Sequence, residues 1–182
     1  MWTIKSRFIK DEKGVVLPSL GLFLPLLMLM SFAAIEVSLI VFEWHRTGEA
    51  TRRAARYMAI EEPVADLSSF VRGSSVVCQG SSAGGVNCSS GAGANISAYG
   101  EMVAQMQAIQ PAIQSEHISI TYSDSGLGEA TTPGGILPMV SVRVENLQKP
   151  LVVIGGFMGM PDVFTYPAFM TNQIANGIGP TS

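Results

Sequence analysis

The most apolar stretch of the chain lies near its beginning, directly after a short charged segment, residues 1–14. That segment ends in Gly14, and no charged residue follows until Glu36. The stretch Val15–Ile35 is 21 residues long and consists mainly of Leu, Met, Phe, Val and Ile. A helix of this length spans roughly 30 Å, about the thickness of the hydrocarbon core of a bilayer. The pattern therefore predicts a membrane-spanning helix over residues 15–42.

After the uncharged stretch, the pattern changes to that of a helix with one apolar and one charged face. Ala50, Ala54 and Met58 recur at the spacing of an α-helix, and arginines occupy other positions around it. Pro63 ends the pattern, because the residue before a proline is disfavoured in a helix. We therefore expect the helix to continue as an amphipathic segment over residues 43–62.

Shorter elements follow in residues 63–182 and indicate one domain. Residues 76–88 read as a hairpin with a loose, Gly/Ser-rich tip, and residues 99–110 as a helix with a Met-rich apolar stripe. Residues 118–122 and 139–145 alternate apolar and polar positions, as strands with one buried face do. The expected fold is α+β, with a long N-terminal helix packed on a small antiparallel sheet and a second helix.

The remaining segments connect or flank these elements. Residues 89–98 and 123–138 are rich in Gly and small polar residues, which favours a linker and a loop. Leu151–Ile154 is either a buried strand or the start of a short helix. Residues 163–169 read as a last strand, whose internal proline places it at a sheet edge. The polar tail from Asn172 is expected to fray.

The two cysteines, Cys78 and Cys88, flank the tip of the predicted hairpin. A disulfide closing this short loop would contribute roughly 3 kcal/mol in the chain-entropy model. The alternatives are free thiols and a zinc site, but zinc needs more ligands. His45 and His117 are the only histidines, and neither has a ligand-like neighbour. We therefore expect a disulfide, which in turn favours an oxidising compartment.

Charge and motifs exclude several classes of function. The formal net charge of −3 argues against a nucleic-acid-binding surface. The sequence contains no Gly-rich phosphate loop in a strand–turn–helix setting and no Ser or Cys in a nucleophile motif. We therefore expect no enzymatic activity, no catalytic residue, no cofactor, no metal and no small-molecule substrate.

The charges on the two sides of the predicted membrane helix nearly balance, so they do not decide its orientation. Long domains translocate largely regardless of charge, and the cysteines favour an oxidising compartment. We therefore place residues 1–14 in the cytoplasm and residues 63–182 on the other side. A secretory signal peptide cleaved near Ala33 and Ala34 is an alternative, but the apolar stretch exceeds the usual core of about 7–15 residues.

Several short motifs follow one another in a fixed order across residues 7–58. They are Arg7-Phe8 with Asp11-Glu12-Lys13-Gly14, Leu24-Pro25-Leu26-Leu27, Ile35-Glu36 and Arg52-Arg53-Ala54-Ala55-Arg56-Tyr57. In this order and spacing they resemble the start of TadE-like proteins. These are small pseudopilins, or minor pilins, of bacterial tight-adherence (Tad/Flp) pilus systems. No single motif is specific, whereas the series in register is fairly specific.

The resemblance implies a role in pilus assembly and cell adhesion. A prepilin peptidase would cut after Gly14 and leave Val15 as the first residue of the mature subunit. The membrane helix would bundle with other pilin and pseudopilin subunits in the bacterial inner membrane. The C-terminal domain would be periplasmic, or extracellular after incorporation in a pilus. Glu36 is the polar position of the membrane helix, facing a partner helix or lying at the outer interface.

One position departs from the family pattern. The fifth residue after the cleavage glycine is usually a glutamate, which meets the N-terminal amine of a neighbouring subunit inside the membrane. Here that position is Ser19. A serine cannot neutralise an ammonium group, and an unpaired charge in the membrane is costly. Ser19 therefore favours a tip, initiation or accessory position over a repeated position in the shaft.

The alternative class is a single-pass, membrane-anchored periplasmic scaffold or binding domain that is never cleaved. Its N-terminus would be Met1 instead of Val15. The apolar cluster Ile154–Pro161 also has two interpretations. It is either a loop tucked under the sheet or an exposed patch that docks another subunit.

Overall fold

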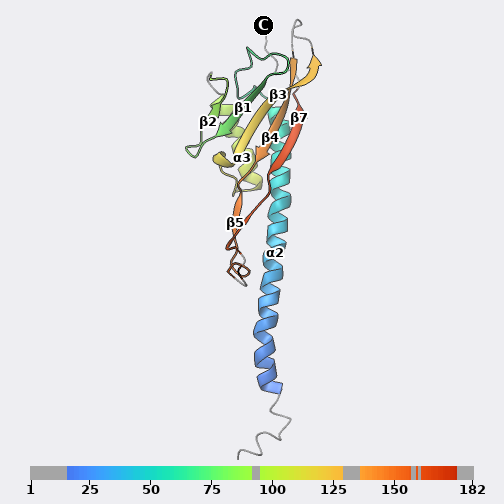
Figure 1. Ribbon diagram of the computed structural model, residues 1–182, viewed down its shortest axis with the longest axis vertical. Coiled ribbons are helices and arrows are strands. Elements are labelled where there is room, and N and C mark those ends of the chain that lie inside the picture. The colour runs from blue at the N-terminus through green and yellow to red at the C-terminus, as the bar shows by residue number, and fades with distance from the viewer. Residues whose placement is uncertain (1–15, 92–94, 129–135, 157–158, 160, 176–182) are drawn as a thin grey trace, which may run out of the picture. The chain divides into compact units, whose positions relative to one another are not determined.

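The computed structural model describes residues 16–91, 95–128, 136–156, 159 and 161–175. The chain divides into two compact units. The N-terminal unit contains the residues up to Val41 together with Pro150–Val163, and the sheet unit contains Phe42–Lys149 and the residues from Phe164 on. The elements are α2 (Val16–Met58), β1 (Ser75–Gly80), β2 (Val86–Cys88), α3 (Ile96–Ile109), η2 (Ser115–His117), β3 (Ile118–Gly128), β4 (Ile136–Val144), β5 (Gln148–Pro150), β6 (Val163–Thr165) and β7 (Phe169–Ile174). Figure 1 labels these elements except η2 and β6.

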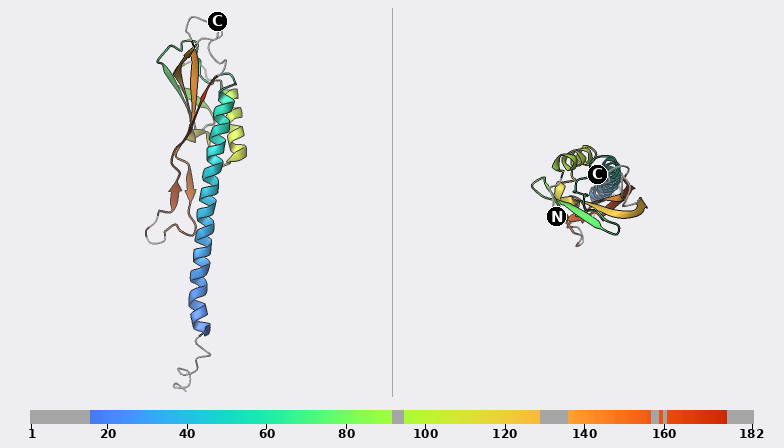
Figure 2. Two further views of the ribbon diagram at one scale, coloured as in Figure 1. Left: turned by 90° about the vertical axis from the view of Figure 1, so that its right-hand side faces the viewer. Right: turned by 90° about the horizontal axis from the view of Figure 1, so that it is seen from above.

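The sheet unit is built on a five-stranded antiparallel sheet with the strand order β2-β1-β3-β4-β7. Ile118, Ile120 and Tyr122 alternate along β3 with more exposed residues and are fully buried, as expected for a strand with one face on the core. Residues 42–58 of α2 and helix α3 lie side by side against this sheet (Figure 2). The expected α+β fold of a long helix on an antiparallel sheet with a second helix is therefore confirmed.

Small side chains line the buried face of α2 in the sheet unit. Ala50 and Ala54 are fully buried and let the helix approach the core closely. Thr47 and Thr51 are also fully buried, and their hydroxyls donate hydrogen bonds to the carbonyl oxygens of Glu43 (2.9 Å) and Thr47 (2.8 Å). These bonds satisfy the two hydroxyls inside the helix itself, so their burial leaves no donor unpaired.

The N-terminal unit combines residues 16–41 of α2 with the segment Pro150–Val163. The two ends of this segment belong to β5 and β6, which pair as a two-stranded sheet. The N–H of Leu151 donates to the carbonyl oxygen of Asp162 at 2.8 Å. This bond closes the base of the connection Pro150–Val163 between β5 and β6, which we call the excursion.

Two helix boundaries differ from the expected ones. Helix α2 ends at Met58, four residues before the expected end at 62, in a turn that includes a hydrogen bond from the N–H of Ile60 to Tyr57 O. Helix α3 begins at Ile96, inside the segment expected to be a linker. The side chain of Asn95 explains this early start, because it accepts a hydrogen bond from the N–H of Ala98 at 3.2 Å and so caps the helix.

The predicted loop over residues 123–138 is wrong at both ends, because β3 runs on to Gly128 and β4 begins at Ile136. The register of β3 against β4 shifts between Asp124 and Leu127, as at a β-bulge, and the two strands pair on both sides of this shift. The Asp124 carboxylate accepts hydrogen bonds from the N–H groups of Gly126 (2.9 Å) and Gly73 (2.8 Å), which lower the pKa of Asp124. Asp124, one of the polar residues that indicated a loop, is thus hydrogen-bonded to backbone N–H groups of the sheet unit.

The C-terminal part of the sheet also differs from the expectation. Leu151–Ile154 is neither a strand nor a helix. The strand expected over 163–169 is divided into β6 and β7, and β7 continues to Ile174 instead of fraying from Asn172. Pairing with β4 holds this end, and Ser141 Oγ donates to Asn172 Oδ1 at 2.8 Å. Of the cluster Ile154–Pro161, the described residues include 154–156, 159 and 161.

Candidate functional site

Helix α2 exposes large apolar side chains along its first half. Among the described residues, the part of α2 from Pro18 onward is the one helix long and apolar enough to cross a membrane. A helix that is apolar all round is typical of a membrane span, and this one is consistent with a single-pass anchor. The exposed residues are Leu20, Leu22, Phe23, Leu24, Leu26, Leu27, Met28, Leu29, Met30, Phe32, Ile35, Val37, Leu39, Val41 and Phe42.

The site residues predicted on the membrane helix do not come together. Gly14 and Val15 lie outside the described residues. Ser19 lies near the start of α2 and is exposed, whereas Glu36 lies further along the same helix and is buried. Seventeen residues separate them, which corresponds to about 25 Å along a helix axis. Ser19 and Glu36 are therefore separate sites.

Cys78 and Cys88 form a disulfide that joins β1 to β2. The two residues lie opposite each other in the antiparallel register of these strands. Cys78 is fully buried in the core of the sheet unit. The bridge therefore fixes the short edge strand β2 to the rest of the sheet.

The side chain of Glu36 binds the backbone of the segment that follows β5. Its Oε1 accepts hydrogen bonds from the N–H groups of Val152 (2.5 Å) and Val153 (3.3 Å). Its Oε2 accepts from Val153 (3.1 Å) and Ile154 (2.8 Å). Glu36 is only 7% exposed. Three consecutive backbone amides thus converge on one buried carboxylate.

Two glycines shape the turn that follows these amides. A side chain at Gly155 would place its Cβ 2.5 Å from the carbonyl oxygen of Leu151, which is closer than real Cβ atoms come. Gly156 adopts a φ of +71°, a conformation that residues with side chains rarely adopt. The Gly155-Gly156 pair therefore allows the chain to fold back and present its N–H groups to Glu36.

This arrangement resolves the electrostatic problem that a buried carboxylate creates. A charge removed from water is costly unless hydrogen bonds replace its hydration. Backbone N–H groups that converge on an anion do so with fixed dipoles, and bonds to an ionised acceptor are stronger than neutral ones. Within the N-terminal unit, Glu36 therefore serves as the attachment point for the segment Val152–Ile154.

Glu43 lies seven residues after Glu36 in α2 and binds side chains within the sheet unit. Its Oε1 forms an ion pair with Nζ of Lys149, and its Oε2 accepts a hydrogen bond from the hydroxyl of Tyr166 at 3.0 Å. The Glu43 and Lys149 side chains are 25% and 19% exposed. Lys149 and Tyr166 flank the excursion Pro150–Val163 in sequence. Glu43 thus binds the chain both before and after the excursion.

Aromatic rings surround the Glu43 partner Tyr166, which is only 3% exposed. Its ring lies 5.1 Å from that of Phe164 and 6.3 Å from that of Trp44, measured between centroids. Trp44 also packs edge-on against Phe169 at 5.2 Å. Burial, the hydrogen bond to Glu43 and the Glu43 charge all raise the pKa of Tyr166. Tyr166 therefore stays protonated and remains a hydrogen-bond donor well above neutral pH.

The sequence analysis identified Glu36 as a polar position but did not identify its partners. Glu43, Lys149 and Tyr166 were not identified at all. One signal was present for Glu36, because a single acidic residue at the end of an apolar helix requires a partner. The glycine pair after Val152–Ile154 was a second signal, since it marks a tight turn whose amides are available.

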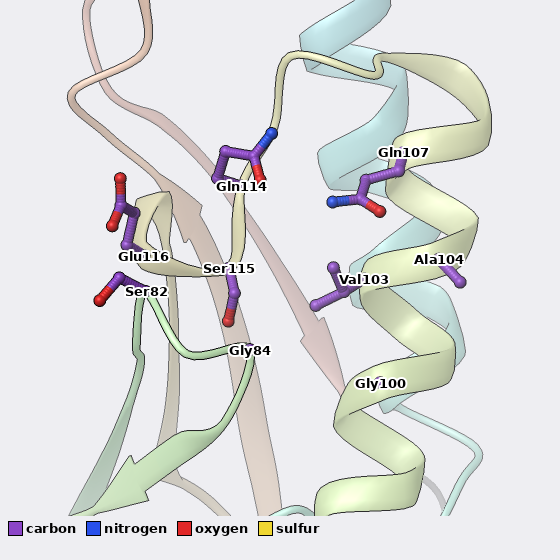
Figure 3. Close-up of a pocket in the computed structure, with 9 residues that line it drawn as sticks. All are labelled: Ser82, Gly84, Gly100, Val103, Ala104, Gln107, Gln114, Ser115 and Glu116. Carbon is purple, nitrogen blue, oxygen red and sulfur yellow. The ribbon is translucent and has the colours of Figure 1, made fainter.

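A hollow lies in the sheet unit between α3 and the loops after β1 and α3 (Figure 3). Two of its polar side chains have partners within the unit, since Gln107 Nε2 donates to Ile113 O at 2.9 Å and Ser115 Oγ lies 2.9 Å from the Tyr99 hydroxyl. Within the described ranges, no group of three or more His, Cys, Asp or Glu residues could hold a metal ion. The lining residues are Ser82, Gly84, Gly100, Val103, Ala104, Gln107, Gln114, Ser115 and Glu116.

The helix that carries both glutamates also matches a known protein family. Residues 15–56 match the model of the TadE-like proteins. The N-terminal region of this chain is TadE-like. The match begins one residue after Gly14, contains Ser19, Glu36 and Glu43, and ends two residues before α2 does. The resemblance seen in the sequence is therefore confirmed for this region.

The TadE-like region covers nearly the whole of α2 but none of the strands. No curated protein and no solved structure matches the chain. The family match thus applies to the helix that carries Glu36 and Glu43, while the fold of the sheet unit rests on the structure itself.

Proposed function

We propose that this chain is a TadE-like pseudopilin, or minor pilin, that takes part in the assembly of a Tad-type pilus. Its membrane helix bundles with the helices of other pilin or pseudopilin subunits, and its sheet unit docks onto partner subunits. The protein spans the bacterial inner membrane once, and its C-terminal domain is periplasmic before any incorporation into an extracellular pilus. It acts by assembly and not by catalysis.

The main support is the position of the family match on the helix. Residues 15–56 include both the part of α2 with exposed apolar side chains and the part buried against the sheet. A helix with these two surfaces anchors the chain in lipid at one end and carries a folded domain at the other. The disulfide Cys78–Cys88 supports a domain in an oxidising compartment.

Processing at Gly14 distinguishes the pseudopilin from an uncleaved periplasmic scaffold or binding domain with a single-pass anchor. A prepilin peptidase would leave Val15 as the N-terminal residue. We expect Gly14→Leu to block this step, because glycine lets the backbone enter the protease site without a side chain. Mass spectrometry of the membrane-extracted protein gives the N-terminus of both forms.

A matched control for this experiment lies within the same helix. Gly21→Leu makes the same chemical change where the structure has open space, so it should leave processing intact. Wild-type protein that begins at Met1, with the same start in both variants, would overturn the pseudopilin and favour the uncleaved anchor.

Ser19 leads to a more specific proposal about where the subunit acts. Because it lacks the carboxylate usual at this position, we expect a tip, initiation or accessory role and only few copies per pilus, or none. Quantitative mass spectrometry of sheared filaments measures the ratio to the major pilin. A ratio close to that of the major subunit would show that a shaft position tolerates serine and would rule out the end position.

A further inference from the structure

The position of Glu36 along α2 corresponds to the far edge of a bilayer. Glu36 lies 20 residues after Val16, and a helix rises by 1.5 Å per residue, so the two are about 30 Å apart along the axis. This distance equals the thickness of a typical hydrocarbon core. The apolar side chains of Phe32 and Ile35 before Glu36 and of Val37 after it are exposed. The exposed surface of α2 is therefore apolar both before and after Glu36 along the helix.

The segment bound by Glu36 lies at the same depth and continues this apolar surface. The amide nitrogen of Val152 is 2.5 Å from Glu36 Oε1, whereas the Val152 side chain is 85% exposed. The nearest charged residues in the sequence are Lys149 before the segment and Asp162 after it. Leu151–Ile154 therefore presents an apolar side chain without any charge that would keep it in water.

The hydrogen bonds of Glu36 remove the main obstacle to contact with lipid. Irregular backbone does not occur in the hydrocarbon core where it is exposed to lipid, because its polar groups would be unsatisfied. Here Glu36 satisfies the N–H groups of Val152, Val153 and Ile154. At the boundary between acyl chains and headgroups, water reaches the carbonyl groups. At the acyl–headgroup boundary, the N–H groups of this segment are therefore bonded to Glu36 and its carbonyl groups to water.

We propose that Leu151–Ile154 inserts into the acyl–headgroup boundary of the bilayer on the side of the C-terminal domain, attached there by Glu36. The chain then contacts the membrane at two places that lie far apart in its sequence. The proposal rests on the proposed function in one respect, because it requires α2 to span a membrane. The partner is the lipid surface itself, which fits an exposed aliphatic side chain beside a membrane helix.

Fluorescence quenching by lipids tests the contact in the full-length protein. Single cysteines replace Val152, Phe32 or Ile60, and each is labelled without reduction, so that the Cys78–Cys88 disulfide stays closed. The labelled proteins are reconstituted in vesicles of phosphatidylethanolamine and phosphatidylglycerol that contain lipids with a spin label high on the acyl chain. The Phe32 probe reports whether α2 is inserted.

Ile60 provides the matched control outside the membrane. It is a 72% exposed aliphatic residue just beyond the end of α2, and Met58 lies about 33 Å further along the helix than Glu36. We expect loss of fluorescence for the Phe32 and Val152 probes but not for the Ile60 probe. A quenched Phe32 probe with an unquenched Val152 probe would overturn the lipid contact and leave the anchor intact. An unquenched Phe32 probe would overturn both the anchor and this inference.

A second variant tests the attachment through Glu36. Glu36→Gln replaces one of the two acceptor oxygens by an NH₂ group, which cannot accept from the backbone amides. We expect the Val152 probe to lose part of its quenching in this variant, while the Phe32 probe keeps its own. Unchanged quenching of the Val152 probe would show that Glu36 does not hold the segment at the membrane.

Discussion

Two glutamates of α2, seven residues apart, have different types of partner. Glu36 binds backbone amides within the N-terminal unit, whereas Glu43 binds the side chains of Lys149 and Tyr166 within the sheet unit. Contacts to backbone amides require a particular turn but tolerate many side chains at the donor positions. Contacts to side chains require particular residues but tolerate small movements of the backbone. The two sites should therefore respond to different kinds of substitution.

The largest effect is expected for removal of the Glu36 carboxylate. Glu36→Leu leaves three backbone N–H groups without their acceptor, and bonds to a charged acceptor contribute about 1.5–3 kcal/mol each. We expect the free energy of local opening at Val152–Ile154 to fall by at least about 3 kcal/mol, with hydrogen exchange at least on the order of 100-fold faster at these amides. Hydrogen-exchange mass spectrometry of the full-length protein in detergent micelles measures this change.

Ser38→Ala is the control for the Glu36 variant. Ser38 lies two residues further along the helix, and its hydroxyl donates to the carbonyl oxygen of Ala34 at 2.8 Å, within the helix itself. Its loss should leave exchange at Val152–Ile154 unchanged. Equal exchange in wild type and Glu36→Leu would contradict the role of the carboxylate.

Gly155→Ala tests the turn instead of the acceptor. The new Cβ would lie 2.5 Å from the carbonyl oxygen of Leu151, so the backbone that carries the donors must shift. We expect a local destabilisation of about 1–3 kcal/mol, as for other overpacked sites, again measured by hydrogen exchange at Val152–Ile154. Gly48→Ala makes the same change in α2 where nothing lies within 4 Å, and should stabilise the helix by about 0.5–1 kcal/mol. Similar effects of the two variants would refute the steric argument.

A double-mutant cycle with Glu43→Gln and Tyr166→Phe tests the side-chain site. The partial exposure of Glu43 weakens its electrostatic interactions, so we expect a coupling free energy of only about 1 kcal/mol from thermal or denaturant unfolding. Neither change should alter exchange at Val152–Ile154, which belongs to the other unit. Faster hydrogen exchange at Val152–Ile154 in either variant would show that the Glu36 and Glu43 sites are not independent.

The same pair also predicts a pH dependence. Because the pKa of Tyr166 is raised in the folded protein, its contribution to stability is fully present below the ordinary tyrosine pKa near 10. That contribution is lost as the pH rises through the pKa that Tyr166 has in the folded protein.

Glu43→Gln removes one acceptor charge and should lower the pKa of Tyr166. Ultraviolet absorbance of tyrosinate, followed against pH, measures the shift. The difference between the titration curves of wild type and Tyr166→Phe identifies the Tyr166 signal. Identical Tyr166 titration curves in wild type and Glu43→Gln would disprove the coupling.

The sequence predicted those features that arise from local periodicity. The uncharged stretch Val15–Ile35 predicted most of the exposed part of α2, and the alternation over 118–122 predicted the centre of β3. The same reasoning failed where a partner distant in sequence decides the structure. β7 continues past Asn172 because β4 supplies hydrogen bonds, and nothing in the polar tail itself indicates this pairing.

The Glu43 site could not be predicted for the same reason. Lys149 and Tyr166 lie 106 and 123 residues after Glu43, and single charged or aromatic residues leave no periodic pattern. The Glu36 site is harder still to recognise, because backbone amides occur at every residue except proline. A turn that gathers three of them leaves only the two glycines as a sign in the sequence.

The continuity of α2 also determines how a mechanical load enters the folded domain. In the proposed membrane anchor, a tension applied to the N-terminal end of α2 runs along the helix axis to residues 42–58, whose alanines and threonines are buried against the core. Such a tension loads the buried contacts in shear, so that many of them must yield together. A strand torn from a sheet edge would instead open one contact at a time. The stripe of small side chains thus makes α2 suited to transmit a pulling force without separating from its domain.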